Sequence, residues 1–101
     1  MYQVMIVDDE PMAASLIVNI IKRKYSNFDI MGTAYDGEEA LELMEKKREP
    51  DVLITDIQMP VMNGLKLVEE TKKRYPEVLS VIVSGYQEFE YAKQAIAFGV
   101  C

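Results

Sequence analysis

The distribution of apolar residues divides the chain into segments that resemble strands and segments that resemble helices. Short continuous apolar runs, which are typical of strands buried on both faces, alternate with longer segments in which apolar residues recur three or four positions apart. The predicted strands cover residues 4–7, 28–34, 52–54 and 79–83, and the predicted helices cover residues 12–24, 36–47, 63–75 and 88–98. Repeated strand-helix order predicts an α/β domain with a parallel sheet and helices on both faces.

Local signals set the ends of the predicted helices. Pro11 suits the first turn of the first helix. Asp36 and Glu39 have the spacing of a capping pair, and Gly99 is a suitable stop for the last helix. The apolar residues at helical spacing are assigned to the core by default. They are Ala13, Leu16, Ile17, Ile20 and Ile21, then Ala40, Leu41 and Met44, then Leu65, Val68 and Thr71, and finally Phe89, Ala92, Ala95 and Ile96.

Length, charge and composition limit the classes of protein to which this chain can belong. A chain of 101 residues, half of them hydrophobic, is one domain or slightly less than one. The net charge of -6 argues against non-specific binding to nucleic acid or to an anionic membrane. No apolar run approaches the roughly 20 residues of a membrane span, and the first residues lack the features of a signal peptide.

The cysteine and histidine counts exclude further chemistry. Cys101 is the only cysteine, so it cannot form an internal disulfide, which fits a reducing cytoplasm. The absence of histidine excludes His-based catalytic triads, zinc sites built on His and a phosphohistidine carried by this chain.

Polar side chains follow three of the predicted strands at the point where each strand ends. Asp8 and Asp9 follow the first strand, Asp56 follows the third, and Ser84 follows the fourth. The carboxyl ends of parallel strands lie along one rim of a sheet, where ligands bind. Carboxylates gathered there repel one another unless some are protonated or a cation is held among them.

Oxygen ligands of this kind suit Mg²⁺, which keeps several waters and completes its shell with phosphate oxygens. The residues therefore predict a magnesium-assisted phosphoryl site in which Asp56 is the nucleophile and the Ser84 hydroxyl binds the phosphoryl group. Each residue also has a plainer interpretation as a helix cap or a turn residue. Their joint occurrence at successive strand ends favours the phosphoryl site over these plainer interpretations.

Three stretches of the sequence resemble the receiver domain of bacterial two-component response regulators. They are residues 7–11 (VDDEP), 55–64 (TDIQMPVMNG) and 83–86 (VSGY), and the resemblance covers essentially the whole chain. It implies a flavodoxin-like doubly wound sheet with strand order 2-1-3-4. Residues 84–92 (SGYQEFEYA) look most like receivers joined to an AraC-type helix-turn-helix domain.

The resemblance implies a role for each residue of the predicted site. Asp56 would accept a phosphoryl group from a phosphohistidine on a sensor histidine kinase. Asp9, Asp56 and the backbone carbonyl of Gln58 would bind Mg²⁺ directly, and Asp8 would act through metal-bound water. No other cofactor is expected, and the domain would be a switch, at most transferring a phosphoryl group to itself and slowly losing it, and not an enzyme.

Further roles implied by the resemblance concern the response to phosphorylation. Ser84 would hydrogen-bond the phosphoryl group and shift with it. Gln58 and Tyr86 occupy positions that tune how long the phosphoryl group lasts. The output, which we expect to be transcription, would be switched through the last helix, residues 88–98.

The resemblance implies a fifth strand ending in Lys-Pro and a fifth helix, which in the family pattern follow the position of Cys101. We therefore expect residues 1–101 to be a single receiver domain, C-terminally incomplete, whose DNA-binding domain would lie elsewhere. We expect this form to bind Mg²⁺ but to be phosphorylated or switched poorly. Self-association through the exposed fourth strand or the last helix is also expected.

Other readings stay open at this point. A receiver-like interaction module that binds no metal would keep the fold without the chemistry. A phosphatase resembling haloacid dehalogenases also uses Asp and Mg²⁺, but its nucleophile follows the first strand in a D-x-D pattern, whereas Asp8 and Asp9 are adjacent. A flavodoxin-like cofactor binder would need a Gly-rich phosphate loop after the first strand, and none is present.

Overall fold

The computed structural model describes residues 1–83, so the predicted helix over 88–98 and its stop at Gly99 lie outside the described residues. Within the described part, the predicted alternation of strands and helices is confirmed. The elements are β1 (Tyr2–Val7), α1 (Pro11–Lys24), β2 (Phe28–Ala34), α2 (Gly37–Lys46), β3 (Val52–Thr55), α3 (Gly64–Arg74) and β4 (Leu79–Ile82).

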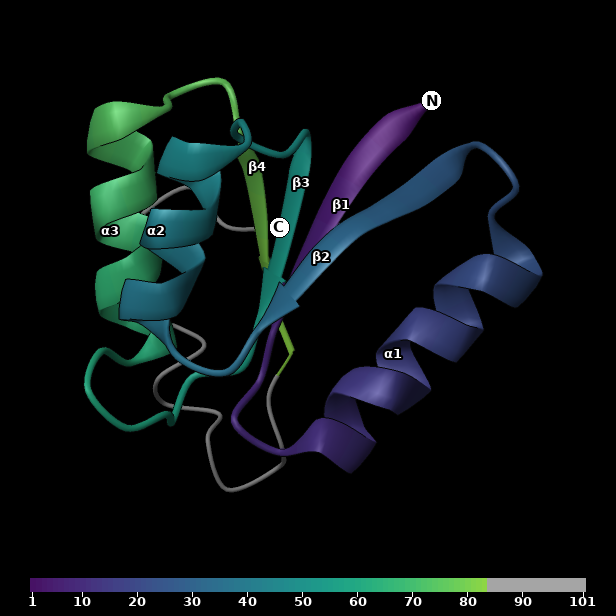
Figure 1. The fold of residues 1–101 in the computed structure, drawn as a ribbon, viewed down its shortest axis with the longest axis horizontal. Helices are drawn as coiled ribbons and strands as arrows, with labels where there is room; N and C mark the ends of the chain where they lie inside the picture. The colour runs from purple at the N-terminus through teal and green to yellow at the C-terminus, as the bar shows by residue number, and fades with distance from the viewer. Residues whose placement is uncertain (84–101) are drawn as a thin grey trace.

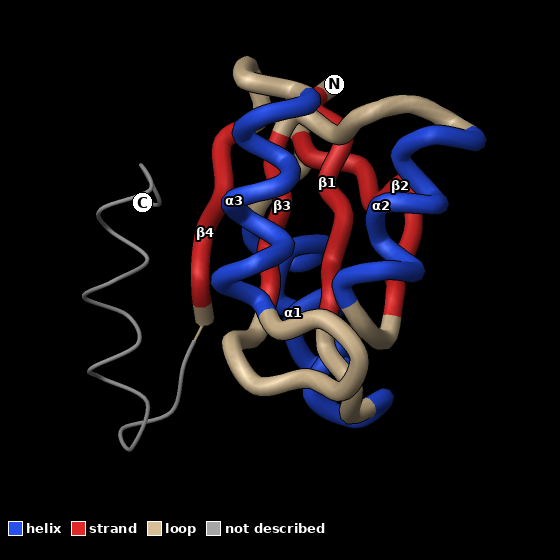
Figure 2. The backbone as a smooth tube through the Cα atoms, turned by 90° about the vertical axis from the view of Figure 1, so that its left-hand side faces the viewer, coloured by secondary structure: helices blue, strands red, loops and turns tan. Residues whose placement is uncertain are grey.

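The strands form one parallel sheet with the order β2-β1-β3-β4, as predicted. Val7 at the end of β1 lies opposite both Ala34 of β2 and Thr55 of β3. Three strands therefore end at the same level of the sheet. β4 lies at the outer edge of the described sheet (Figure 2), where Leu79 is 44% exposed.

Helices cover both faces of the sheet: α2 and α3 lie on one side and α1 on the other (Figure 1). Met5 and Val7 of β1 belong to the core cluster beneath α2 and α3, whereas Val4 and Ile6 belong to the cluster beneath α1. All four side chains are fully buried. This double burial explains why β1 is a continuous apolar run instead of an alternating one.

The prediction that all the apolar residues of α1 are core residues is wrong for Leu16 and Ile20, which are 62% and 43% exposed. The buried residues of this helix are Ala14 and Ile21, and Ile17 packs beside them. At 3.6 residues per turn, the apolar positions of α1 extend around more of the helix than one sheet face can cover. The helix therefore buries one side and leaves apolar side chains on the other.

The starts of α2 and α3 are capped by side chains. The Asp36 side chain accepts a hydrogen bond from the Glu39 amide at 2.8 Å, which confirms the predicted cap. Asn63 accepts from the amide of Lys66 at 2.9 Å. Caps of this type each stabilise a helix by about 1 kcal/mol.

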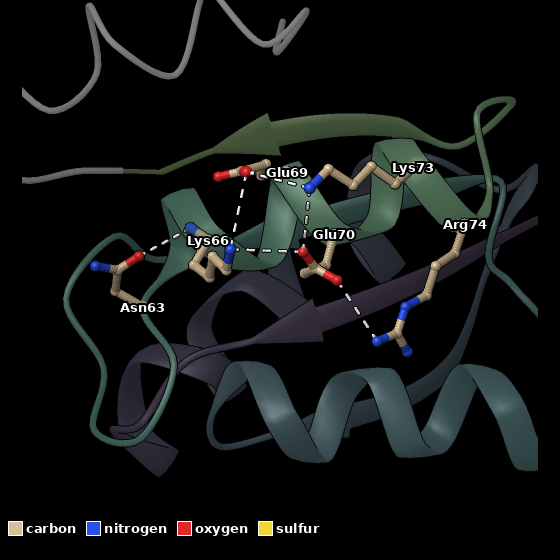
Figure 3. Close-up of polar contacts among 6 residues, drawn as sticks. All are labelled: Asn63, Lys66, Glu69, Glu70, Lys73 and Arg74. Atoms are coloured by element: carbon tan, nitrogen blue, oxygen red, sulfur yellow. Dashed lines mark hydrogen bonds and ion pairs between the residues drawn. The ribbon is translucent and has the colours of Figure 1, made fainter.

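The exposed side of α3 carries a network of ion pairs with N···O distances of 3.5–3.8 Å (Figure 3). Exposed pairs at this spacing contribute only about 0.3–0.5 kcal/mol each. The network therefore supports the helix locally and does not determine the fold. Its members are Lys66, Glu69, Glu70, Lys73 and Arg74.

Candidate metal and phosphoryl site

Three carboxylates meet at the carboxyl ends of β1 and β3. One oxygen from each of Asp8, Asp9 and Asp56 lies within 4.8 Å of the other two. Backbone hydrogen bonds between neighbouring strands continue just past the strand ends and fix the positions of Asp8 and Asp56. The Asp56 amide donates to the carbonyl of Val7 at 2.9 Å, and the Asp8 amide donates to that of Ala34 at 3.0 Å. The grouping of these three acids was predicted from the sequence, and the structure brings them together.

Backbone amides hold two of the carboxylates in place. Asp8 is 7% exposed, and its Oδ1 accepts a hydrogen bond from the Glu10 amide at 2.9 Å. Oδ1 of Asp56 accepts from the Ile57 amide at 2.8 Å. Asp9 is exposed to solvent. The site therefore combines two oriented carboxylates with one that is open to solvent.

Thr55 is a supporting residue that the sequence reasoning overlooked. It is fully buried, and its Oγ1 donates a hydrogen bond to the backbone carbonyl of Asp56 at 2.9 Å. The carbonyl of Thr55 accepts from the amide of Val83 at 3.0 Å. A polar residue at the end of an otherwise apolar strand was the available signal, because a buried hydroxyl needs a nearby partner.

The loop after Asp56 is tightly folded. The Gly64 amide donates to the carbonyl of Ile57 at 2.6 Å, which closes the loop at the start of α3. Within it, the Met62 amide donates to the carbonyl of Pro60 at 2.7 Å across Val61, whose φ is 68°. This is a three-residue γ-turn with a β-branched residue in an unfavourable backbone region.

A second loop is attached to this one. The Gly37 amide donates to the carbonyl of Met62 at 3.1 Å, and a side-chain carbon at position 37 would lie within 2.7 Å of Met62 Cγ. The start of α2 is therefore packed directly against the loop that follows Asp56. No sequence motif indicated this contact, since the two residues lie far apart along the chain.

The remaining predicted site residues are placed only in part. Gln58 is exposed in the loop after β3. Ser84 and Tyr86 lie outside the described residues. Their assigned roles therefore stay predictions.

The donor set fits a hydrated divalent cation. Carboxylate oxygens are the ligands that Mg²⁺ prefers, and it keeps several waters when a protein binds it through only a few carboxylates. Oxygens within 4.8 Å of one another can share one ion of this kind, directly or through its waters. A bound divalent cation would also offset the mutual repulsion of the three clustered carboxylates.

Comparison with known proteins identifies the family. The model of the response regulator receiver domain matches residues 4–101. The chain is 37% identical over 100 residues to the transcriptional regulatory protein YesN of Bacillus subtilis, and the match covers 99% of this chain and 27% of YesN. It is 38% identical over 96 residues to HptR of Staphylococcus aureus, covering 95% of this chain and 37% of HptR.

Solved structures agree with the sequence comparison. The receiver domain of AraT, a response regulator from Geobacillus stearothermophilus, superposes with a TM-score of 0.88 at 38% identity, covering 98% of this chain and 76% of that one. A LuxR-family DNA-binding response regulator from S. aureus gives a TM-score of 0.87 at 29% identity, covering 99% and 82%. The chain therefore belongs to the response regulator receiver domain family.

Two further facts concern the share of the relatives' length that the chain covers and the character of its helices. The chain spans between about a quarter and two fifths of the length of the curated relatives that it matches. Within residues 1–83, no helix has the length and apolar character needed to cross a bilayer.

Proposed function

We propose that this chain is the phosphorylatable receiver of a two-component signalling system, with Asp56 as the phosphoryl acceptor. The observation that carries the proposal is the cluster of Asp8, Asp9 and Asp56 at one rim of the sheet, in a chain of the receiver family. The donor is a phosphohistidine of a sensor histidine kinase, because this chain has no histidine of its own.

In the proposed transfer, a carboxylate oxygen of Asp56 attacks phosphorus and forms an acyl phosphate. The P–N bond to the kinase histidine breaks, and its electron pair stays on the imidazole nitrogen, which takes a proton from water. The Ile57 amide fixes the rotation of the attacking carboxylate through Oδ1. Asp9, Asp56 and the carbonyl of Gln58 would hold Mg²⁺ directly, Asp8 would act through metal-bound water, and the ion would neutralise charge at the phosphoryl oxygens.

Phosphorylation then acts as a switch through charge. The phosphoryl group adds about 1.5 to 2 negative charges at pH 7. In the proposal it attracts the Ser84 hydroxyl and shifts the domain between two conformations, while Gln58 and Tyr86 tune its lifetime. The names of the relatives YesN and HptR support a transcriptional output. The proposal of an AraC-type output domain rests on residues 84–92 alone. We also propose that residues 1–101 form a single receiver domain.

The proposed location is the cytoplasm, which the single Cys101 suits. Self-association through the fourth strand also stays a proposal. It is supported by the edge position of β4 and the exposure of Leu79. The predicted contact through the last helix falls outside the described residues.

The test is phosphorylation by a small-molecule donor such as acetyl phosphate, read from the intact mass of the protein. Wild type and Asp29→Asn should gain one phosphoryl group, slowly as expected for this form, and Asp56→Asn should gain none. Asp29 is a matched control because it is an exposed aspartate on β2, paired with Gln3 near the start of β1. The absence of any labelling would instead favour the alternative function, a phosphorylation-deficient receiver-like fragment that acts in protein interaction.

A further inference from the structure

Thr55 lies directly before the proposed phosphoryl acceptor and is fully buried, although its side chain is polar. The neighbouring strands fix its backbone. It lies opposite Val7 of β1 and Ile82 of β4 in the parallel sheet, and its carbonyl accepts a hydrogen bond from the Val83 amide at 3.0 Å. The Thr55 hydroxyl therefore projects from backbone that is held on both sides by other strands.

The Thr55 hydroxyl and the Asp56 carboxylate hold opposite ends of one peptide group. Thr55 Oγ1 donates to the backbone carbonyl of Asp56 at 2.9 Å, and the amide of the same peptide group, on Ile57, donates to Asp56 Oδ1 at 2.8 Å. A trans peptide is planar, and its C=O and N–H point in opposite directions. A rotation that takes the carbonyl away from Thr55 therefore also takes the Ile57 amide away from the carboxylate.

The surroundings of this peptide group restrict it further. The Asp56 amide donates to the carbonyl of Val7 at 2.9 Å, and the Ile57 side chain is 1% exposed. The carbonyl of Asp56 lies so close to Gly64 that a side-chain carbon there would collide with it. A carbonyl packed in this way needs a donor from the protein, and the Thr55 hydroxyl supplies one.

We propose that Thr55 is a positioning residue for phosphoryl transfer. Its hydroxyl fixes the Asp56–Ile57 peptide group, and the Ile57 amide in turn holds the attacking carboxylate in one orientation. Holding a reacting group in its productive orientation lowers the barrier to attack. This inference rests on the proposed function of Asp56 as phosphoryl acceptor, and Thr55 acts through the peptide group and not on the phosphoryl group itself.

A second buried threonine provides a matched control. Thr71 of α3 is also fully buried, but its Oγ1 has no hydrogen-bond partner among the described residues. Replacing either threonine with valine removes a buried hydroxyl and keeps the shape of the side chain. Only the change at Thr55 removes a donor to the carbonyl of Asp56.

Initial rates of phosphorylation by acetyl phosphate at saturating Mg²⁺, read from the intact mass, test the proposal. Thr55→Val should be labelled about fivefold more slowly than wild type, which corresponds to the loss of one ordinary hydrogen bond. Thr55→Ser should keep most of the rate because it keeps the hydroxyl, although the lost methyl group lowers its stability. Thr71→Val should be labelled as wild type is. Thermal unfolding of each variant sets a temperature at which all of them are folded.

The amide proton of Ile57 gives a measurement that does not depend on phosphorylation. In ¹H–¹⁵N NMR spectra its resonance should move upfield in Thr55→Val, because the hydrogen bond to the Asp56 carboxylate is weakened. In Thr55→Ser and Thr71→Val it should stay near its wild-type position. A purely structural role for Thr55 would not separate the valine variant from the serine variant in this way.

Three results would overturn the proposal. The first is a Thr55→Val variant that is labelled as fast as wild type, and the second is equal slowing in Thr55→Val and Thr55→Ser, which would assign the effect to packing. The third is slow labelling of Thr55→Val with an unchanged Ile57 resonance. A wild type that gains no label would instead overturn the proposed function of Asp56, and the role of Thr55 in transfer would fall with it.

Discussion

A side-chain carbon at position 64 would collide with the backbone carbonyl oxygen of Asp56. Gly64 is buried at the first position of α3, and its amide closes the loop onto Ile57. The backbone next to the proposed phosphoryl acceptor therefore packs against the start of α3 with no room for a methyl group. This contact explains on steric grounds why the TDIQMPVMNG segment has glycine at position 64.

Gly64→Ala should lower the free energy of unfolding by about 2 kcal/mol, because backbone on both sides of the collision must move. The alanine gains helix propensity, which offsets only part of that cost. Urea denaturation measures the change. Gly32→Ala is the control, since its new carbon would meet the flexible end of Leu43 and should cost much less. Equal losses in both variants would contradict the steric account.

Val61→Asn should raise the free energy of unfolding by about 1 kcal/mol, because asparagine tolerates positive φ better than a β-branched residue. Val61 has a φ of 68° and is 75% exposed, so little packing is lost. Val61→Thr keeps the branching and should leave stability nearly unchanged. Thermal or urea unfolding compares the two, and a stability gain shared by both variants would show that strain is not the cause.

Thr71→Val should stabilise the protein by about 1 kcal/mol. Thr71 is fully buried in α3, and its Oγ1 has no hydrogen-bond partner among the described residues. Valine keeps the shape and removes the buried polar atom. Thr71→Ser, which keeps the hydroxyl and loses a methyl group, should destabilise by about 1 kcal/mol. A destabilised valine variant would mean that the hydroxyl has a partner after all.

Asp9→Asn should weaken Mg²⁺ binding about tenfold or more, because it removes one of the three clustered carboxylates that would hold the ion. Isothermal titration calorimetry measures the affinity. Asp29→Asn should bind as wild type does, since Asp29 is not among the clustered carboxylates. A wild-type chain that binds no Mg²⁺ would support the metal-independent interpretation and remove the basis of the proposed chemistry.

The sheet and the grouping of the acids could be predicted because both depend on short patterns. The apolar run before Asp8 and the run before Asp56 each end in a carboxylate, and parallel strands align their carboxyl ends. The buried side of α1 was harder to predict. Its apolar residues surround most of the helix, so periodicity alone did not show that Leu16 and Ile20 face outward.

The loop contacts could not be predicted for a different reason. The hydrogen bond from Gly37 to Met62 joins segments that are distant in sequence, and the positive φ of Val61 occurs at a residue type that rarely adopts it. Both depend on how the loop after β3 packs against α2. Tertiary contacts of this kind leave no local pattern in the residues concerned.

The most direct test of the proposed phosphoryl site is to map the label after incubation with acetyl phosphate, with Mg²⁺ and again with a chelator. Peptide mass spectrometry locates the phosphoryl group. We predict that it lies on Asp56 when Mg²⁺ is present, and that labelling is lost when the ion is removed. Phosphorylation at another residue, or equal labelling of Asp56 in the presence of chelator, would contradict the account.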